Sequence, residues 1–122
     1  MKVEVIVAKV YGIHVVELNA GTTPEFFERF VIEQFLPALP LHRTPGVKAS
    51  LLRADRGARA NQYVWMFEFD SVEIRDRYFP QPQTISDELK ALIEPLHELA
   101  QIWDRASTRT KTDYVVLGSS IE

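Results

Sequence analysis

The segment from Gln62 to Asp70 constrains the fold of this chain more than any other. It reads Gln-Tyr-Val-Trp-Met-Phe-Glu-Phe-Asp, and its aromatic and β-branched residues predict a β-strand. Either Asp70 or Ser71 can cap a short helix that follows at once over residues 71–79, and Pro80 ends that helix. A strand that runs straight into a capped helix, late in a small chain, indicates an α+β fold.

Both faces of the predicted strand are largely apolar. One face carries Tyr63, Trp65, Phe67 and Phe69, and the other carries Val64, Met66 and Glu68. An antiparallel sheet with one face in water alternates apolar and polar residues much more strictly. If helices cover one face, the other would be a large exposed apolar patch. We therefore expect a second copy of the same sheet to cover it in a symmetric homodimer.

The rest of the chain predicts the order β-α-β-β-α-β in a single domain over residues 1–122. In the first half we expect a strand within 2–18 with a bulge or bend at Gly12, a helix from Pro24 to about residue 38, and strands over 47–55 and 62–70. After the helix over 71–79, we expect a longer helix over 85–103 that is broken near Pro95. A polar connection over 105–112 then leads to a last strand over 114–117. This order is that of the ferredoxin-like arrangement, an antiparallel sheet with its helices on one face.

The first predicted helix leaves two alternatives open. Its start is capped either by Thr23, with Pro24 in the first helical position, or by Thr22 paired with Glu25. Ile32 and Leu36 lie opposite its main apolar stripe. They predict a second buried contact, which is made either by another subunit or by the chain just after the helix.

Composition excludes several classes of function. The net charge is −3 and the isoelectric point is about 5.6, so no basic surface is expected to bind nucleic acid. The chain has no cysteine, which excludes disulfides and thiolate catalysis and fits a cytoplasmic protein. Glu4 interrupts an N-terminal apolar run that is too short for a signal peptide or a membrane span. The three histidines share no metal-binding spacing, so we expect no metal and no cofactor.

His14 and Glu68 are the candidate catalytic residues. His14 lies in an apolar strand, where it could accept a proton near pH 7 or could simply be a hydrogen-bonded histidine of the sheet. His42 falls in a loop, and His97 falls at the polar margin of a helix. Glu68 lies among aromatic residues, so it must be paired or have a raised pKa.

Arg53, Tyr63 and Trp65 are the candidate substrate-binding residues. Arg53 is a possible cross-strand partner for Glu68, which would make that carboxylate either a site residue or part of an ordinary ion pair. Trp65 and Tyr63 could line a flat pocket for an aromatic ligand. The alternative for both aromatic residues is the core or a dimer interface.

Three segments carry a resemblance to a known group of proteins. They are Ile13-His-Val-Val-Glu-Leu18, the turn from Gly21 to Pro24-Glu-Phe-Phe, and Trp65-Met-Phe-Glu-Phe-Asp-Ser71 followed by Arg75 and Arg77. In these segments the chain resembles the dimeric α/β-barrel superfamily, which includes antibiotic-biosynthesis-monooxygenase-like, EthD-like and NIPSNAP-like domains. The resemblance implies a ferredoxin-like fold and a dimeric α/β barrel.

The same resemblance argues against haem. Haem-degrading members have an asparagine at the end of the first strand, a strand tryptophan, and a histidine on the helix after the third strand. Asn19 and Trp65 match the first two, but the helix over 71–79 holds no histidine, and its nearest substitute is Tyr78.

Two classes of function remain. The resemblance implies a cofactor-independent enzyme, monooxygenase-like or isomerase-like, acting on an aromatic or polyketide-like substrate. In that case His14 transfers a proton, Trp65 stacks on a ring and Glu68 orients a polar group. The alternative is a non-catalytic ligand-binding or assembly module whose apolar sheet face is only a dimer interface. A cavity lined by one of these polar residues favours the enzyme, whereas a fully packed interface favours the module.

Overall fold

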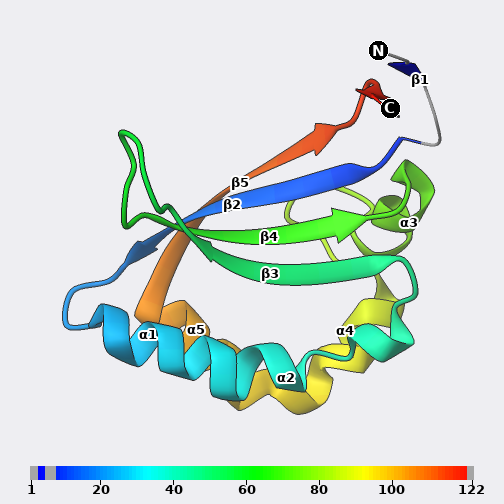
Figure 1. Cartoon of the computed structure of the whole chain (residues 1–122). Helices are drawn as coiled ribbons and strands as arrows, with labels where there is room; N and C mark the ends of the chain where they lie inside the picture. Colours follow the sequence, from blue (N-terminus) through cyan, green and yellow to red (C-terminus); the bar gives the residue numbers. More distant parts are fainter. Residues whose placement is uncertain (1–2, 5–7, 121–122) are drawn as a thin grey trace.

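A four-stranded antiparallel sheet forms the centre of the molecule. The computed structural model describes residues 3–4 and 8–120. The strands β2 (Val10–Leu18), β3 (Val47–Arg53), β4 (Tyr63–Phe69) and β5 (Ser107–Val115) lie in the order β3-β4-β2-β5 (Figure 1). Short β1 (Val3–Glu4) pairs separately with β6 (Ser119–Ser120). The predicted α+β architecture is confirmed, and it is compatible with a ferredoxin-like fold.

The first helix starts and ends where the sequence predicts. The hydroxyl of Thr23 accepts a hydrogen bond from the backbone N–H of Phe26 at 3.1 Å, so Thr23 is the cap of α1 (Pro24–Phe30). The helix continues through a π-helical turn (Val31–Phe35) into α2 (Leu36–Ala38). Of the two residues opposite the main stripe, Leu36 packs against the core and Ile32 is exposed.

Two further predictions about helices are confirmed. The Ser71 hydroxyl, not Asp70, caps α3 (Val72–Tyr78), accepting the backbone N–H of Ile74 at 3.1 Å. The long helix is interrupted at Pro95, giving α4 (Asp87–Ile93), a 3-10 turn (Glu94–Leu96) and α5 (His97–Ala106). A second 3-10 turn covers Leu41–Arg43. None of the described helices has the length and apolarity needed to cross a bilayer.

The sheet has two unlike faces. Helices α1, α2, α4 and α5 lie along one of them, here called the inner face (Figure 1). It carries the even-numbered residues of β2 and the odd-numbered residues of β3, β4 and β5. The core lies there, formed by Val16, Phe27, Phe30, Val31, Tyr63, Trp65, Trp103 and Ala106. The opposite, outer face carries no helix in the described part of the chain.

The first strand differs from the prediction at its start. β2 begins at Val10 and passes through Gly12 without a bulge, because Gly12 pairs regularly with Phe67 on one side and Asp113 on the other. A Cβ at position 12 would lie 3.2 Å from the Asp113 carboxylate, which would have to move by a few tenths of an ångström to accommodate it. The expected strand residues 2 and 5–7 lie outside the described residues.

The last strand corrects a second prediction. The polar connection expected over 105–112 is instead the end of α5 followed by β5, which begins at Ser107. Thr108, Thr110 and Thr112 point to the outer face, while Arg109 and Lys111 point to the inner face. The pattern is the period of two that marks a strand. The sequence pattern does not distinguish this strand from a loop, because both alternating sets are polar.

Candidate functional site

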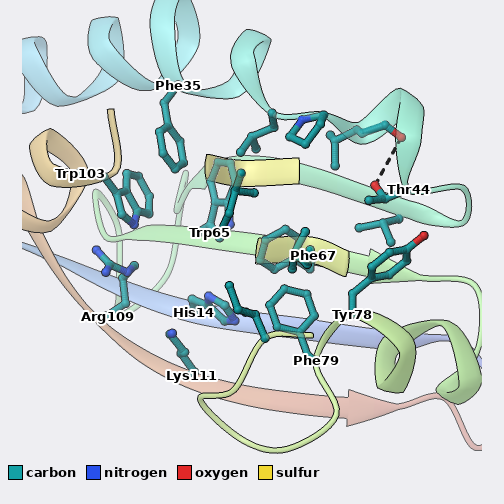
Figure 2. A pocket seen from close by; sticks show the side chains of 17 residues that line it. His14, Phe35, Thr44, Trp65, Phe67, Tyr78, Phe79, Trp103, Arg109 and Lys111 are labelled. Atoms are coloured by element: carbon teal, nitrogen blue, oxygen red, sulfur yellow. Dashed lines mark hydrogen bonds between the residues drawn. The ribbon is translucent and has the colours of Figure 1, made fainter. Parts of the chain in front are cut away.

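A cavity of about 270 Å³ lies between the inner face and the helices (Figure 2). Trp65 and Phe67 of β4 form its floor, and Phe35, Tyr78 and Phe79 contribute further aromatic walls. Leu39, Pro40, Leu41, Val47, Ile85, Leu89 and Ile93 add aliphatic surface. Drug-sized ligands usually occupy pockets of roughly 300–1,000 Å³, so this cavity suits a small, flat, apolar molecule.

A π-helical turn positions one wall of the cavity. The backbone N–H of Leu36 donates to the carbonyl of Val31, five residues earlier, which widens the helix at this point. Phe35 ends the turn and stacks on Trp103 with ring centroids 4.7 Å apart and planes 3° from parallel. Both rings meet the edge of Trp65, at 5.7 and 5.3 Å. Three elements therefore meet in one aromatic cluster at the end of the cavity.

The opposite wall is basic. His14 of β2 lies directly across from Lys111 of β5, and Val16 lies across from Arg109, so His14, Arg109 and Lys111 share one patch of the inner face (Figure 2). His14 also packs edge-on against Phe67, with centroids 5.6 Å apart. A ligand on the aromatic floor would therefore meet an imidazole and two cations along one side.

His14 is neutral at physiological pH. Burial lowers its pKa to about 4, the positive charges of Lys111 and Arg109 act in the same direction, and Asp113 opposes them. The imidazole therefore has a free lone pair at pH 7 and can accept a proton. Its proton affinity would rise if an anion formed beside it, because opposite charges stabilise each other.

The two cations of the basic wall are not equivalent. The Arg109 guanidinium binds the Asp104 carboxylate at 2.7 Å and the Ser107 hydroxyl at 2.9 Å, and it lies 4.8 Å from the centre of the Trp103 ring. Lys111 is exposed at the rim of the cavity and forms no ion pair with any described residue. Its ammonium is the uncompensated charge of this wall.

Tyr78 supplies an unpaired polar group at the other end. Its side chain is 1% exposed, and its hydroxyl has no hydrogen-bond partner among the described residues. Thr44 lies at the same end of the cavity and donates to the carbonyl of Leu41 at 3.4 Å (Figure 2). A buried hydroxyl without a partner costs free energy, and a bound ligand is one way to satisfy it.

Of the five residues proposed from the sequence, only His14 and Trp65 line this cavity. His14 and Trp65 are opposite one another in the β2–β4 register and line the same cavity. Trp65 is buried, as the core alternative also expected, so it serves both the core and the cavity floor.

Tyr63 and Arg53 lie at a different place. They line a separate small hollow beside α1, where the Tyr63 hydroxyl donates to the Glu28 carboxylate and Arg53 binds the same oxygen at 3.1 Å. Burial and the bond to Glu28 raise the pKa of Tyr63 to about 12. This cluster ties α1 to the sheet, and its polar groups satisfy one another.

Glu68 lies on the outer face and is separated from His14 by the sheet. Its carboxylate accepts hydrogen bonds from Lys9 at 3.0 Å and from the Tyr11 hydroxyl at 3.3 Å. The predicted pairing with Arg53 is therefore wrong, because Arg53 points to the inner face. The bond from Lys9 lowers the pKa of Glu68, whereas an unpaired carboxylate there would have had a raised pKa.

The remaining candidates lie away from the cavity. His42 is exposed in the 3-10 turn, and His97 is exposed at the start of α5, within 3.1 Å of Gln101. Arg75 binds Asp76 and Asp113, and Arg77 binds Glu88 with two hydrogen bonds. Within residues 3–4 and 8–120, no group of three or more acidic or histidine residues is arranged to hold a metal ion.

Sequence reasoning missed Arg109, Lys111, Tyr78 and Phe35 as cavity residues. The alternation of β5 could have revealed the first two, because it places them on the face of His14. Tyr78 ends an amphipathic helix, where one aromatic residue gives no sign of burial. Phe35 depends on the π-helical turn, which has no sequence signature.

Comparison with known proteins supports the fold alone. No family model matches the chain, and no curated protein matches it. The solution structure of a hypothetical protein from Arabidopsis thaliana is similar, with a TM-score of 0.52 and 16% sequence identity over 93% of this chain and 90% of that chain. This likeness covers nearly the whole molecule, and it carries no information on activity.

Proposed function

We propose that the cavity is the binding site of a small aromatic or polyketide-like molecule, and that the protein is a cofactor-independent enzyme of the monooxygenase-like or isomerase-like kind. The observation that carries this proposal is the presence of His14 in the cavity beside Trp65. A fully packed interface without such a polar residue would have favoured the alternative, a non-catalytic ligand-binding or assembly module. Glu68, Tyr63 and Arg53 lie outside the cavity and have no part in this site.

The geometry suggests how such chemistry would proceed. A flat ring would lie on Trp65 and Phe67, which exclude water from it. Neutral His14 would take the proton of a phenol or enol, and the resulting anion would be stabilised by Lys111. A phenolate formed in this way could react with dioxygen, one oxygen atom entering the ring and the other leaving as water, to give a quinone. In an isomerase the same proton would return at another carbon.

A thermal-shift screen against phenols and quinones tests this function. We expect at least one compound to raise the melting temperature of the protein, and the effect to disappear in His14→Ala. His97→Ala is the matched control, because His97 is exposed on α5 and is not among the residues that line the cavity. Mass spectrometry of the incubated compound then separates an enzyme from a binding module. A hit that binds unchanged, with no exchange of ring protons in deuterated water, would favour the module.

We also propose that two copies associate through the outer face. Its centre is apolar, with Ile13 opposite Met66 and Val15 opposite Val64. Leu52 of β3 pairs with Val64 from the other side. Leu52 is 41% exposed, and the threonines of β5 form a polar margin. An apolar centre with a polar rim is typical of protein interfaces.

Light scattering after size exclusion should give a dimer for the wild type and a 14.0 kDa monomer for Met66→Glu. A wild type that is monomeric at micromolar concentration would refute this assembly.

A further inference from the structure

The cavity has a charge imbalance that its own residues do not remove. Arg109 is neutralised by Asp104, and the next acid along the inner face, Asp113, is held by Arg75 at 2.6 Å. Lys111 lies between these two ion pairs and has no acidic partner among the described residues. His14 across from it is neutral. The wall therefore carries one excess positive charge directed to the cavity rim.

We propose that the ligand of this cavity is an organic acid, a small ring-bearing molecule whose carboxylate or other anionic oxygen group is bound by Lys111 and His14 while its ring lies on Trp65 and Phe67. This inference rests on the proposed small-molecule site and specifies the chemical class of its ligand. Lys111 supplies the charge, and the N–H of neutral His14 supplies a directed donor.

The distribution of polar groups supports this orientation. The basic wall lies at the β2–β5 side of the cavity, whereas the unpaired Tyr78 hydroxyl lies at the opposite side, near Thr44 (Figure 2). Aromatic and aliphatic surface occupies the space between them. An acid bound with its anion at Lys111 therefore places its apolar body on this surface. In the reverse orientation the anion would meet only the neutral hydroxyls of Tyr78 and Thr44, far from the charge of Lys111, and a buried charge without an opposite charge is costly.

The test compares two probes of nearly the same size and shape, the anion 2-naphthoate and the neutral 2-naphthamide. Binding to the full chain is followed by quenching of tryptophan fluorescence, because Trp65 and Trp103 both line the cavity. We expect 2-naphthoate to bind about tenfold more tightly at pH 7, a difference of about 1.4 kcal/mol. Raising the salt concentration should weaken 2-naphthoate selectively, since Lys111 is at the solvent-exposed rim.

Lys111→Met removes the charge and keeps most of the length of the side chain. In this variant 2-naphthoate should bind only as tightly as 2-naphthamide, and the affinity for 2-naphthamide should not change. Lys48→Met is the matched control, because Lys48 is an exposed lysine on the outer face. This control should keep the tenfold preference. Circular dichroism of both variants confirms that they are folded.

Each alternative outcome has a distinct meaning. Equal affinities of the wild type for the two probes would overturn the organic-acid inference and leave the small-molecule site intact. Loss of the preference in Lys48→Met as well as in Lys111→Met would also overturn it, since charge would then be acting from outside the cavity. If neither probe binds and no compound of the thermal-shift screen does, both the inference and the proposed function fail.

Discussion

The two faces of the sheet are built from the same strands but differ in how their polar groups are satisfied. On the outer face the Glu68 carboxylate is paired with Lys9, and Lys48 is exposed to solvent. On the inner face, Lys111 and the Tyr78 hydroxyl have no partner among the described residues. A buried polar group normally has a partner, so the Tyr78 hydroxyl supports a ligand in the cavity, whereas Lys111 is exposed and adds a positive charge at its rim. This contrast is the basis for the proposals that the inner face binds a ligand and that the outer face joins two copies.

The largest expected difference between the faces concerns neighbouring residues of β4. Trp65→Ala should lower the free energy of unfolding by about 3–5 kcal/mol, because Trp65 is buried in the aromatic cluster. Met66→Ala on the outer face should cost far less in a dilute sample, since Met66 is only partly buried. Urea unfolding measures both. If the outer face joins two copies, the loss for Met66→Ala should grow with protein concentration. Equal losses in dilute samples would contradict the distinction between the faces.

The next difference concerns pH. His14 titrates near pH 6.5 in the unfolded chain but only at about 4 in the folded protein, so the unfolded state binds more protons between these values. The contribution of neutral His14 to stability is complete above pH 6.5 and is lost as pH falls towards 4. We expect His14→Gln to have a shallower decline of melting temperature in this window. Identical declines in both proteins would show that burial does not hold His14 neutral.

Lys111 provides a check on the same titration. The positive charge of Lys111 lowers the pKa of His14, in the same direction as the larger effect of burial. Lys111→Met should therefore raise the pKa of His14, which an NMR titration of the imidazole protons measures directly. A pKa of His14 that stays at its wild-type value would show that the charge of Lys111 does not act on His14. That result would weaken the argument that the two side chains bind one anion.

A smaller effect should have the opposite sign. Tyr78→Phe removes a buried hydroxyl that has no partner among the described residues, so the unliganded protein should become more stable by about 1 kcal/mol. Thermal unfolding measures the change, and any ligand found by screening should bind the variant less tightly. Tyr63→Phe is the control, because the Tyr63 hydroxyl is bonded to Glu28 and its loss should destabilise. Destabilisation by Tyr78→Phe would mean that the hydroxyl is satisfied in solution.

The smallest effect is expected on the outer face. Glu68→Gln removes the charge that pairs with Lys9 but keeps the shape of the side chain, and both side chains are partly exposed. We expect a lower melting temperature, with a smaller change than for any inner-face substitution above. A large loss would indicate that Glu68 is desolvated in solution, as a second copy over the outer face would require.

The sequence predicted the architecture well because local signals agreed with the tertiary structure. The Thr23 and Pro24 start of α1, the short helix after β4 and the interruption at Pro95 are all caused by nearby residues. The candidate site was predicted less well because it depends on which face of the sheet each strand residue occupies. The placement of His14 and Trp65 together, and of Glu68 away from them, follows from the register of β2 and β4 and from which face the helices cover. Neither is encoded in any single segment.

The π-helical turn at Val31–Phe35 has a consequence for tolerance to changes in chain length. A turn closed five residues apart holds one residue more than an α-helical turn, and one residue of an α-helix rotates the chain by about 100°. Deleting exposed Glu33 would let the segment relax to a plain α-helix while removing no core side chain. Phe35 would then keep roughly its direction towards Trp65 and Trp103, because the deletion removes the extra residue that the wider turn accommodates. The helix can therefore lose one surface residue at this turn with little change in the cavity wall, whereas a deletion in an ordinary α-helical turn would rotate everything that follows by about 100°.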